Sequence, residues 1–432
     1  MAESIVVSFQ GPGSGTAALS WGQRELWGGM VRQQTWMPMG IVLPLPPGRT
    51  LDDVAAELRF IMERFPSMRT RLRRREGRPP LQVLAAEGAV ELEVVDAGAE
   101  EPEAVAARVS RRLHDTPFDF ERDWPVRTAV IRRDGVLTHQ VTVVCHLVND
   151  GFGGLVLAGE VAKWHAGEAL PEPTAMSPLE QAEWQASDAG RRQSAAALRY
   201  WEKVLRAIDP QRFPGPVDAR TPRHWQARFR SRALHLAAEE IARRTGADRS
   251  TVLLTAFAVA LAETTGIHPV VVRVVVNNRF RRALAESVSP VSQPALCVLD
   301  VADRPFAEAV QLTGQRTLVA YKHAYFDPDD LDALIARVGA ERGAPIDIAC
   351  YFNDRRAPSV DAEPGNFQAA AGESTFAWIA RQDRPNERLF LTIEADPHTV
   401  DLDICGDTGH IPPAMLEAVV RGMEAVTVSE VA

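Results

Sequence analysis

The most informative stretch of the sequence is THQVTVVCHLVNDGFGGLVL, Thr138 to Leu157. Its first residues, Thr138 to Cys145, combine alternation with β-branched side chains, a pattern typical of a mostly buried strand. From Gly151 onward, apolar residues recur at helical spacing and predict a helix that begins there. His146 and Asp150 lie in the five residues between the two elements. The order strand, loop, helix therefore predicts an imidazole, a carboxylate and the N–H groups of a helix N-terminus in one small volume.

This HxxxDG spacing allows two interpretations. A clustered imidazole and carboxylate beside backbone N–H groups can take a proton from a nucleophile and stabilise an oxyanion. A core histidine next to an aspartate that caps a helix would give the same spacing, because clustered ionisable groups are often structural. The spacing alone leaves both interpretations open.

Length and composition indicate a folded chain of two domains or one large pseudo-symmetric domain. The chain has 432 residues, 46% of them hydrophobic, and a formal net charge of −9. An acidic chain has no overall field for polyanions, so nucleic acid is not an expected partner. Four separated cysteines give no metal or disulfide pattern, and no apolar run is long enough for a bilayer. We therefore expect a cytoplasmic protein without a metal site and without a membrane partner.

Several further elements are indicated by end signals and periodicity. Ser20 and Gln23 have capping-box spacing at the start of a helix, and a second helix follows Thr50. Arg133-Asp134-Gly135 predicts a hairpin turn that leads into Thr138 to Cys145. Ser250 is expected to cap an apolar helix, residues 251–265, that Gly266 ends, and residues 269–276 predict a strand.

The segment CHLVNDG resembles the HHxxxDG motif of nonribosomal peptide synthetase condensation domains, which belong to the chloramphenicol-acetyltransferase-like superfamily. His146 matches the second, catalytic histidine of the motif, Asp150 its aspartate and Gly151 its glycine. The resemblance covers nearly the whole chain through further ordered motifs. These are LSWGQRELW (19–27), RFPSMRTRL (64–72), TPFDFERDWPVR (116–127), LRYWEKVL (198–205), and a second-half run from Thr251 to NNR (277–279), in which Asn278 replaces a glycine.

The resemblance implies an α+β fold of two chloramphenicol-acetyltransferase-like lobes, each a mixed sheet with flanking helices, arranged as a V-shaped pseudo-dimer. We place the N-terminal lobe with the CHLVNDG motif at residues 1–175 and the C-terminal lobe at residues 176–432. A tunnel between the lobes would hold His146 at its centre. Tunnel or substrate-lining positions would include Cys145, Asn149, Ser292, Gln293 and Asn353.

The activity implied by the resemblance is acyl transfer from a carrier-protein thioester to an amine, by a stand-alone condensation enzyme of natural-product biosynthesis. His146 would remove a proton from the amine or orient it, and the N–H of Gly151 would donate to the oxyanion. Asp150 and Arg279 would form a structural ion pair. No cofactor is expected to be bound, because the phosphopantetheine arm of an acyl or peptidyl carrier protein brings the substrate. The acceptor would be a small amine or a second carrier-bound group.

Several alternatives stay open. Cys145 stands where the family normally has histidine, and it is either a His-paired nucleophile or a packing residue on the opposite face of the strand. A catalytically silent recruitment module, or an acyltransferase that makes esters on alcohols, would fit the same motifs. The basic stretch Arg69 to Arg78 either receives an acidic carrier protein or is a solvated strand edge.

Overall fold

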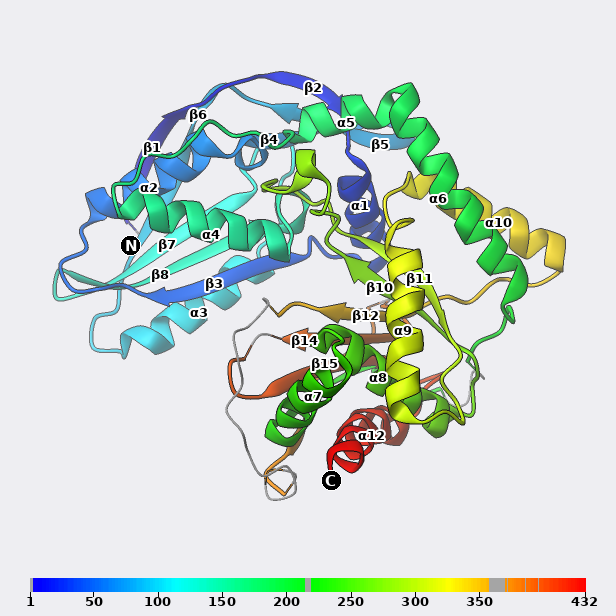
Figure 1. Cartoon of the computed structure of the whole chain (residues 1–432). Helices are drawn as coiled ribbons and strands as arrows, with labels where there is room; N and C mark the ends of the chain where they lie inside the picture. The colour runs from blue at the N-terminus through cyan, green and yellow to red at the C-terminus, as the bar shows by residue number, and fades with distance from the viewer. Residues whose placement is uncertain (1–2, 214–218, 357–369, 371, 385, 395) are drawn as a thin grey trace. The chain divides into compact units, whose positions relative to one another are not determined.

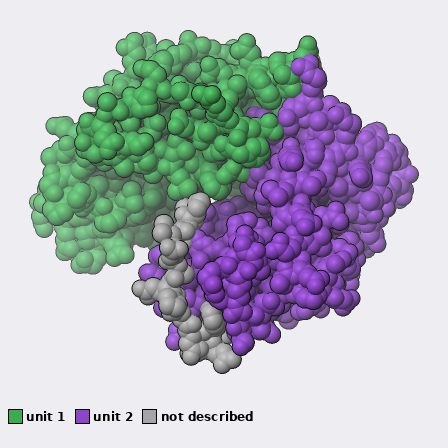
Figure 2. Space-filling view, in the orientation of Figure 1, with its two compact units in different colours: residues 1–191, 277–292 green, residues 192–276, 293–432 purple. Residues whose placement is uncertain are grey.

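The computed structural model describes residues 3–213, 219–356, 370, 372–384, 386–394 and 396–432. The chain divides into two compact units, shown in Figure 1 as a ribbon and coloured separately in Figure 2. Unit 1 contains residues 1–191 and 277–292, and unit 2 contains residues 192–276 and 293–432. From the sequence we expect a single boundary between the lobes at residue 175. The two units differ from this expectation, because the segment 277–292 belongs to the first unit although it lies far along the chain.

Unit 1 is built on a five-stranded mixed sheet in the order β1-β6-β7-β8-β3, in which only β6 and β7 are parallel among the described pairs. A smaller antiparallel sheet has the order β2-β5-β4. The strands are β1 (Glu3–Gln10), β2 (Gly15–Ala18), β3 (Pro38–Pro44), β4 (Thr70–Arg75), β5 (Arg78–Leu84), β6 (Glu87–Asp96), β7 (Val126–Arg133) and β8 (Val136–Cys145).

Helices of unit 1 pack against the larger sheet and form two apolar clusters with it. Val54, Leu58 and Met62 of α2 pack with sheet residues such as Leu92 and Val130, in one cluster. The second cluster contains residues of α3 together with Met30 of α1 and Cys145 of β8. The helices are α1 (Trp21–Gln33), α2 (Leu51–Arg64), α3 (Pro102–Asp115), α4 (Gly151–His165) and α5 (Pro178–Ala186).

Unit 2 contains a seven-stranded mixed sheet in the order β11-β10-β12-β14-β15-β9-β13. The central strands β10, β12 and β14 are parallel, and the others pair antiparallel. The strands are β9 (His224–Ser231), β10 (Val270–Val276), β11 (Gln293–Leu299), β12 (Cys350–Asp354), β13 (Thr375–Gln382), β14 (Leu389–Glu394) and β15 (Val400–Asp407). The helices are α6 (Asp188–Ala207, whose first turn lies in unit 1), α7 (Arg232–Thr245), α8 (Arg249–Thr265), α9 (Phe306–Tyr321), α10 (Pro328–Arg342) and α12 (Pro413–Val431).

Most of the expected end signals are present in the structure. The Ser20–Gln23 capping box is formed at the start of α1, and Gly266 ends α8 in the left-handed conformation. Asp134 and Gly135 have φ values of 52° and 79° in the turn between β7 and β8. The prediction of Ser250 as a cap is wrong, because the side chain of Asp248 accepts the N–H of Thr251 at 2.9 Å and the helix begins two residues earlier than expected. No helix in the described part of the chain is long and apolar enough to cross a membrane.

Arg69 is the first residue of the basic stretch that the sequence allows as a surface for a carrier protein. In the structure its side chain is completely buried. Its guanidinium donates to the carbonyl oxygens of Gly11, Pro12 and Ala85, the bond to Pro12 being 2.8 Å long. Gly11 leaves room for this side chain, since a Cβ there would lie 2.7 Å from the Arg69 guanidinium carbon. Arg69 therefore joins the chain after β1 to the β4–β5 region and is no part of a surface for a partner.

We expect Arg69→Ala to lower the free energy of unfolding by about 3 kcal/mol or more, because buried carbonyl groups that lose their donor each cost about 1–3 kcal/mol. The exposed Arg73 is the matched control, and Arg73→Ala should change stability by no more than about 0.5 kcal/mol. Urea unfolding followed by circular dichroism measures both. Equal stability of the two variants would contradict the buried role of Arg69.

Candidate functional site

The CHLVNDG segment forms a tight connection at the end of a buried strand. β8 ends at Cys145, a single 3₁₀ turn covers His146–Val148, and α4 begins at Gly151. Asp150 caps the helix, and its Oδ1 accepts the N–H of Gly153 at 2.8 Å. The backbone carbonyl of Asp150 also accepts the N–H of Gly154 at 2.9 Å. The aspartate of the motif thus determines where α4 begins and how the preceding turn is held.

The carboxylate of Asp150 is buried, with only 4% of its side chain exposed, and both oxygens receive several donors. Oδ1 lies 2.8 Å from Nη2 of Arg279 in addition to the Gly153 N–H. Oδ2 accepts Nη1 of Arg279 and the N–H groups of Val291 and Ser292, each at 3.1 Å, and the Ser292 hydroxyl at 2.8 Å. Because each oxygen has strong donors, the cost of burying the charge is offset locally.

These contacts also determine the charge state of the carboxylate. Burial acts to raise the pKa of Asp150, but the positive charge and hydrogen bonds of Arg279, together with the bonds from Gly153 and Ser292, hold this pKa below its usual range. The carboxylate is therefore ionised at neutral pH, and its pairing with Arg279 contributes to stability there.

Arg279 connects the motif to the segment 277–292. Its Nη2 donates to the carbonyls of Ser287 and Ser289 at 2.8 and 3.1 Å. Asn278, just before it, has φ 56°, a left-handed conformation that glycine and asparagine tolerate best. The Asn278 side chain donates to the carbonyl of Val291 at 2.9 Å. Asparagine tolerates this left-handed conformation, and its side chain makes a bond across the loop that a glycine could not make.

The imidazole of His146 is oriented by the backbone of its own turn. Its Nδ1 lies 2.8 Å from the carbonyl oxygen of Asn149. A carbonyl oxygen can only accept, so Nδ1 carries the hydrogen and, in the neutral ring, the lone pair is on Nε2. The side chain is partly exposed, whereas Leu147 and Val148 after it are buried. The site thus holds a histidine in the tautomer that can accept a proton at Nε2.

Gln23 is a buried residue near the site whose second role the sequence did not reveal. Its Oε1 accepts the N–H of Ser20 at 2.8 Å in the capping box, and its Nε2 donates to the carbonyl of Leu147 at 3.3 Å. Gly22 next to it allows close approach, because a Cβ there would lie 2.1 Å from the carbonyl oxygen of Pro290. The capping-box spacing identified Gln23, but only the tertiary structure could show that α1 supports the His146 turn.

Cys145 packs inside unit 1. The residue is fully buried in the cluster that includes Leu113 and Val143, and its Sγ lies 3.5 Å from the carbonyl oxygen of Trp36. Burial raises the pKa of the Cys145 thiol to about 12. A thiol with this pKa is not a nucleophile at neutral pH, so the geometry favours packing.

The remaining predicted site residues fall into two groups. Ser292 binds Asp150, Asn149 is 6% exposed and lies against Gly153, and Gly151 is exposed at the start of α4. The other two residues belong to unit 2. Gln293 is buried and exchanges hydrogen bonds with the backbone of Phe326, while Asn353 lies on β12 opposite Thr392.

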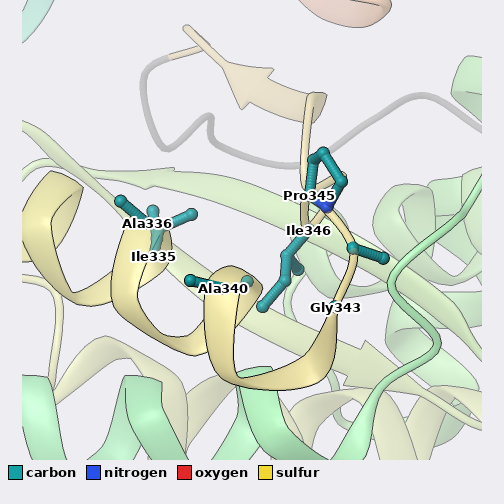
Figure 3. Close-up of a pocket in the computed structure, with 8 residues that line it drawn as sticks. Ile335, Ala336, Ala340, Gly343, Pro345 and Ile346 are labelled. Carbon is teal, nitrogen blue, oxygen red and sulfur yellow. The ribbon is translucent and has the colours of Figure 1, made fainter.

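A hollow of about 440 Å³ lies on unit 2, at the end of α10 (Figure 3). Its lining is formed by small and apolar side chains and contains no ionisable group. The lining residues are Ile335, Ala336, Gly339, Ala340, Gly343, Ala344, Pro345 and Ile346. The His146 turn, by contrast, contains an imidazole and a buried carboxylate. Across the described residues, no group of three or more His, Cys, Asp or Glu side chains could hold a metal ion.

Comparison with known proteins identifies the family. Residues 15–402 match the condensation-domain model, so this chain belongs to the condensation-domain family. The AMB antimetabolite synthetase AmbB of Pseudomonas aeruginosa is 26% identical over 364 residues, which cover 81% of this chain and 29% of AmbB. The chain thus spans less than a third of the length of that relative.

Solved structures have the same fold. A condensation domain studied for chain release from the enacyloxin polyketide synthase matches with a TM-score of 0.74 and 19% identity, over 96% of this chain and 83% of that one. The X-domain in complex with OxyB from teicoplanin biosynthesis matches with a TM-score of 0.67 and 18% identity, over 97% and 95%. The α+β fold of two chloramphenicol-acetyltransferase-like lobes is therefore confirmed. The family transfers acyl groups in nonribosomal peptide and polyketide biosynthesis.

We expect Asp150→Asn and Arg279→Gln each to lower the free energy of unfolding by about 3–5 kcal/mol, because each leaves a buried partner uncompensated. The double variant should lose much less than the sum. Glu100→Gln in the exposed Arg108–Glu100 pair is the control, with an expected loss below about 1 kcal/mol. Additive losses in urea unfolding would contradict direct coupling.

The same pair predicts a pH effect with a definite sign. The folded-state pKa of Asp150 lies below its unfolded value, so its stabilisation is complete above the unfolded pKa of about 3.9 and is lost as the pH falls through the folded value. We expect the stability of the wild type to fall more steeply than that of Asp150→Asn when the pH is lowered below about 4. Equal slopes in acid unfolding would contradict the lowered pKa.

Cys145 should resist alkylation in the folded protein. We expect iodoacetamide at pH 8 to modify Cys145 only after unfolding in urea, since the thiol is buried and its pKa is raised to about 12. Burial raises the pKa of the partly exposed Cys405 less, to about 11, so this thiol is the internal control and should react before Cys145. Peptide mass spectrometry measures both rates. Fast native labelling of Cys145 would instead support a reactive thiolate.

Proposed function

We propose that this protein transfers an acyl group from a carrier-bound thioester to an amine, with His146 as the residue that handles the acceptor proton. The observation that carries the proposal is the hydrogen bond from His146 Nδ1 to the carbonyl of Asn149. This bond leaves the lone pair on Nε2, where a general base needs it. Family membership supports the reaction class, because condensation domains act on carrier-bound substrates.

In the proposed reaction, the acceptor nitrogen attacks the thioester carbonyl and His146 Nε2 accepts its proton. The carbonyl oxygen becomes an oxyanion, which needs a donor in place before the reaction. The N–H of Gly151 is suited to this role because it is the first amide of α4, at the positive end of the helix. Collapse of the intermediate expels the pantetheine thiolate, and the proton held by the imidazole can neutralise it.

Asp150 and Arg279 act as positioning residues in this proposal. The Asp150 carboxylate accepts the backbone N–H groups of Gly153, Val291 and Ser292, and Arg279 pairs with the same carboxylate. They fix the start of α4 and therefore the Asn149 carbonyl that orients the ring. A small displacement of a catalytic group can cost about 10²-fold in rate, so the pair can influence turnover without contacting the substrate.

A catalytically silent recruitment module is the second candidate. It is favoured by one observation, the packed Cys145 at the position where the motif normally has its first histidine. The X-domain that forms a complex with OxyB is an example of this fold in a complex with another protein. A module of this kind would bind its partner but would not need His146.

The test is turnover with an acyl-pantetheine thioester and a panel of amines, measured by mass spectrometry. We expect His146→Ala to lower the amide-forming rate by about 10²–10⁴-fold, the usual contribution of a positioned base. His139→Ala changes a histidine of β8, the strand that precedes the turn; it is the matched control and should retain wild-type rates. A parallel series with alcohols decides whether the product is an amide or an ester.

Two results would contradict the proposal. The first is a rate for His146→Ala equal to that of the wild type with every acceptor that reacts. The second is the absence of product with any acceptor while a loaded carrier protein still binds the wild type and His146→Ala equally. The second result would support the recruitment module.

A further inference from the structure

An exposed hairpin of unit 1 carries four arginines that the site does not use. Arg73, Arg74 and Arg75 end β4, and Arg78 begins β5 after a two-residue turn of Glu76 and Gly77. All four side chains are exposed. We call this group the arginine hairpin; Arg69, which the sequence placed with it, is buried elsewhere. The hairpin therefore carries four positive charges and one negative charge, that of Glu76, on a chain whose net charge is −9.

Two of these arginines face each other directly. Arg75 and Arg78 are cross-strand partners in the β4–β5 register. Like charges opposite each other on adjacent strands destabilise a sheet. Elsewhere in the chain, arginines on a strand have acidic cross-strand partners. Arg228 and Arg230 of β9 lie opposite Asp403 and Asp401 of β15 and form ion pairs with them. The arginine hairpin thus carries a repulsion that an external anion would relieve.

Acidic groups of the protein do not neutralise the patch. In the described part of the chain, Arg73, Arg74, Arg75 and Arg78 form no ion pair, and the Nε of Arg75 donates to the carbonyl of Pro79 at 2.9 Å. The one acidic contact is a carboxylate oxygen of Glu121, which accepts the backbone N–H of Arg74 at 2.9 Å. The four positive charges therefore remain available to a partner.

Protection of an open sheet edge does not account for the arginines. Charged residues often keep exposed edge strands from pairing with other chains. The outer edge of β4 is already occupied, since the N–H of Leu72 donates to the carbonyl of Phe120 at 2.7 Å and the N–H of Arg74 to Glu121. The arginines thus have no edge of this kind to guard at these positions.

We propose that the arginine hairpin docks an acidic protein surface, namely that of the carrier protein that delivers the acyl group. This inference rests on the proposed function for the identity of the partner. The guanidinium groups supply several donors each in a geometry that suits carboxylates, and complementary charge accelerates encounter. Docking here would bring the partner to the unit that holds His146 without contributing any group to the chemistry.

The experiment compares binding and turnover in matched variants. Arg73→Gln/Arg78→Gln removes two charges from the hairpin, and Arg243→Gln/Arg244→Gln removes two from α7 as the control. Binding is measured by fluorescence anisotropy with a panel of labelled, acyl-loaded carrier proteins. We expect the hairpin variant to bind about 10-fold more weakly at about 20 mM NaCl, with the difference shrinking at about 200 mM, and the control to bind as the wild type does.

Turnover separates docking from chemistry. With a carrier-bound donor, the hairpin variant should have a KM raised about 10-fold and an unchanged kcat, since the arginines contact only the carrier. With acyl-pantetheine, which lacks the carrier, wild type and variant should be equal. If the wild type turns over no donor, the proposed function is wrong. The anisotropy comparison of the wild type with the hairpin variant still tests whether the arginine hairpin binds the carrier protein.

The thermal stability of the hairpin variant supplies a further check. Because Arg78→Gln removes the charge opposite Arg75, its unfolding midpoint should be equal to or higher than that of the wild type. Weaker carrier binding with unreduced stability supports a docking surface. Equal carrier binding by the wild type and the hairpin variant would overturn the proposal. The absence of binding of any carrier to the wild type would also overturn it.

Discussion

The buried charge of Asp150 is the constraint on which the rest of the site depends. A carboxylate with 4% of its side chain exposed is stable only if donors surround it, and these come from Arg279, Gly153, Val291 and Ser292. Gly153 lies in the first turn of α4, whereas the other three donor residues lie in the segment after β10, far away in the sequence. One ionised group therefore holds the segment 277–292 in unit 1 and sets the start of the helix beside His146.

Backbone carbonyl groups position the His146 turn and its imidazole ring. The Asn149 carbonyl fixes the ring of His146, and α1 supports the same turn through the Gln23 amide. Cys145, the position at which the chain departs from the family motif, packs into the core of unit 1 with its pKa raised to about 12 by burial. In this chain Cys145 therefore contributes to the core, while the Asn149 carbonyl orients the ring of His146.

Local signals in the sequence predicted local structure well. The capping box of α1, the β7–β8 turn and the left-handed Gly266 all depend on residues within a few positions of one another. Ser250 failed as a cap because Asp248 offers a stronger acceptor two residues earlier. The burial of Arg69 and the Gln23–Leu147 bond depend on contacts distant in sequence, which periodicity does not contain. Resemblance to a family identified Asp150 and Arg279 together, whereas spacing alone could not.

The most direct test of the account is the tautomer of His146. Nitrogen-15 NMR of histidine-labelled protein distinguishes a ring protonated at Nδ1 from one protonated at Nε2, and loss of the signal in His146→Gln assigns it. At a pH where the ring is neutral, we expect the hydrogen on Nδ1, bonded to the Asn149 carbonyl, and the lone pair on Nε2. A neutral ring with its hydrogen on Nε2 would leave no base facing the acceptor and would contradict the account.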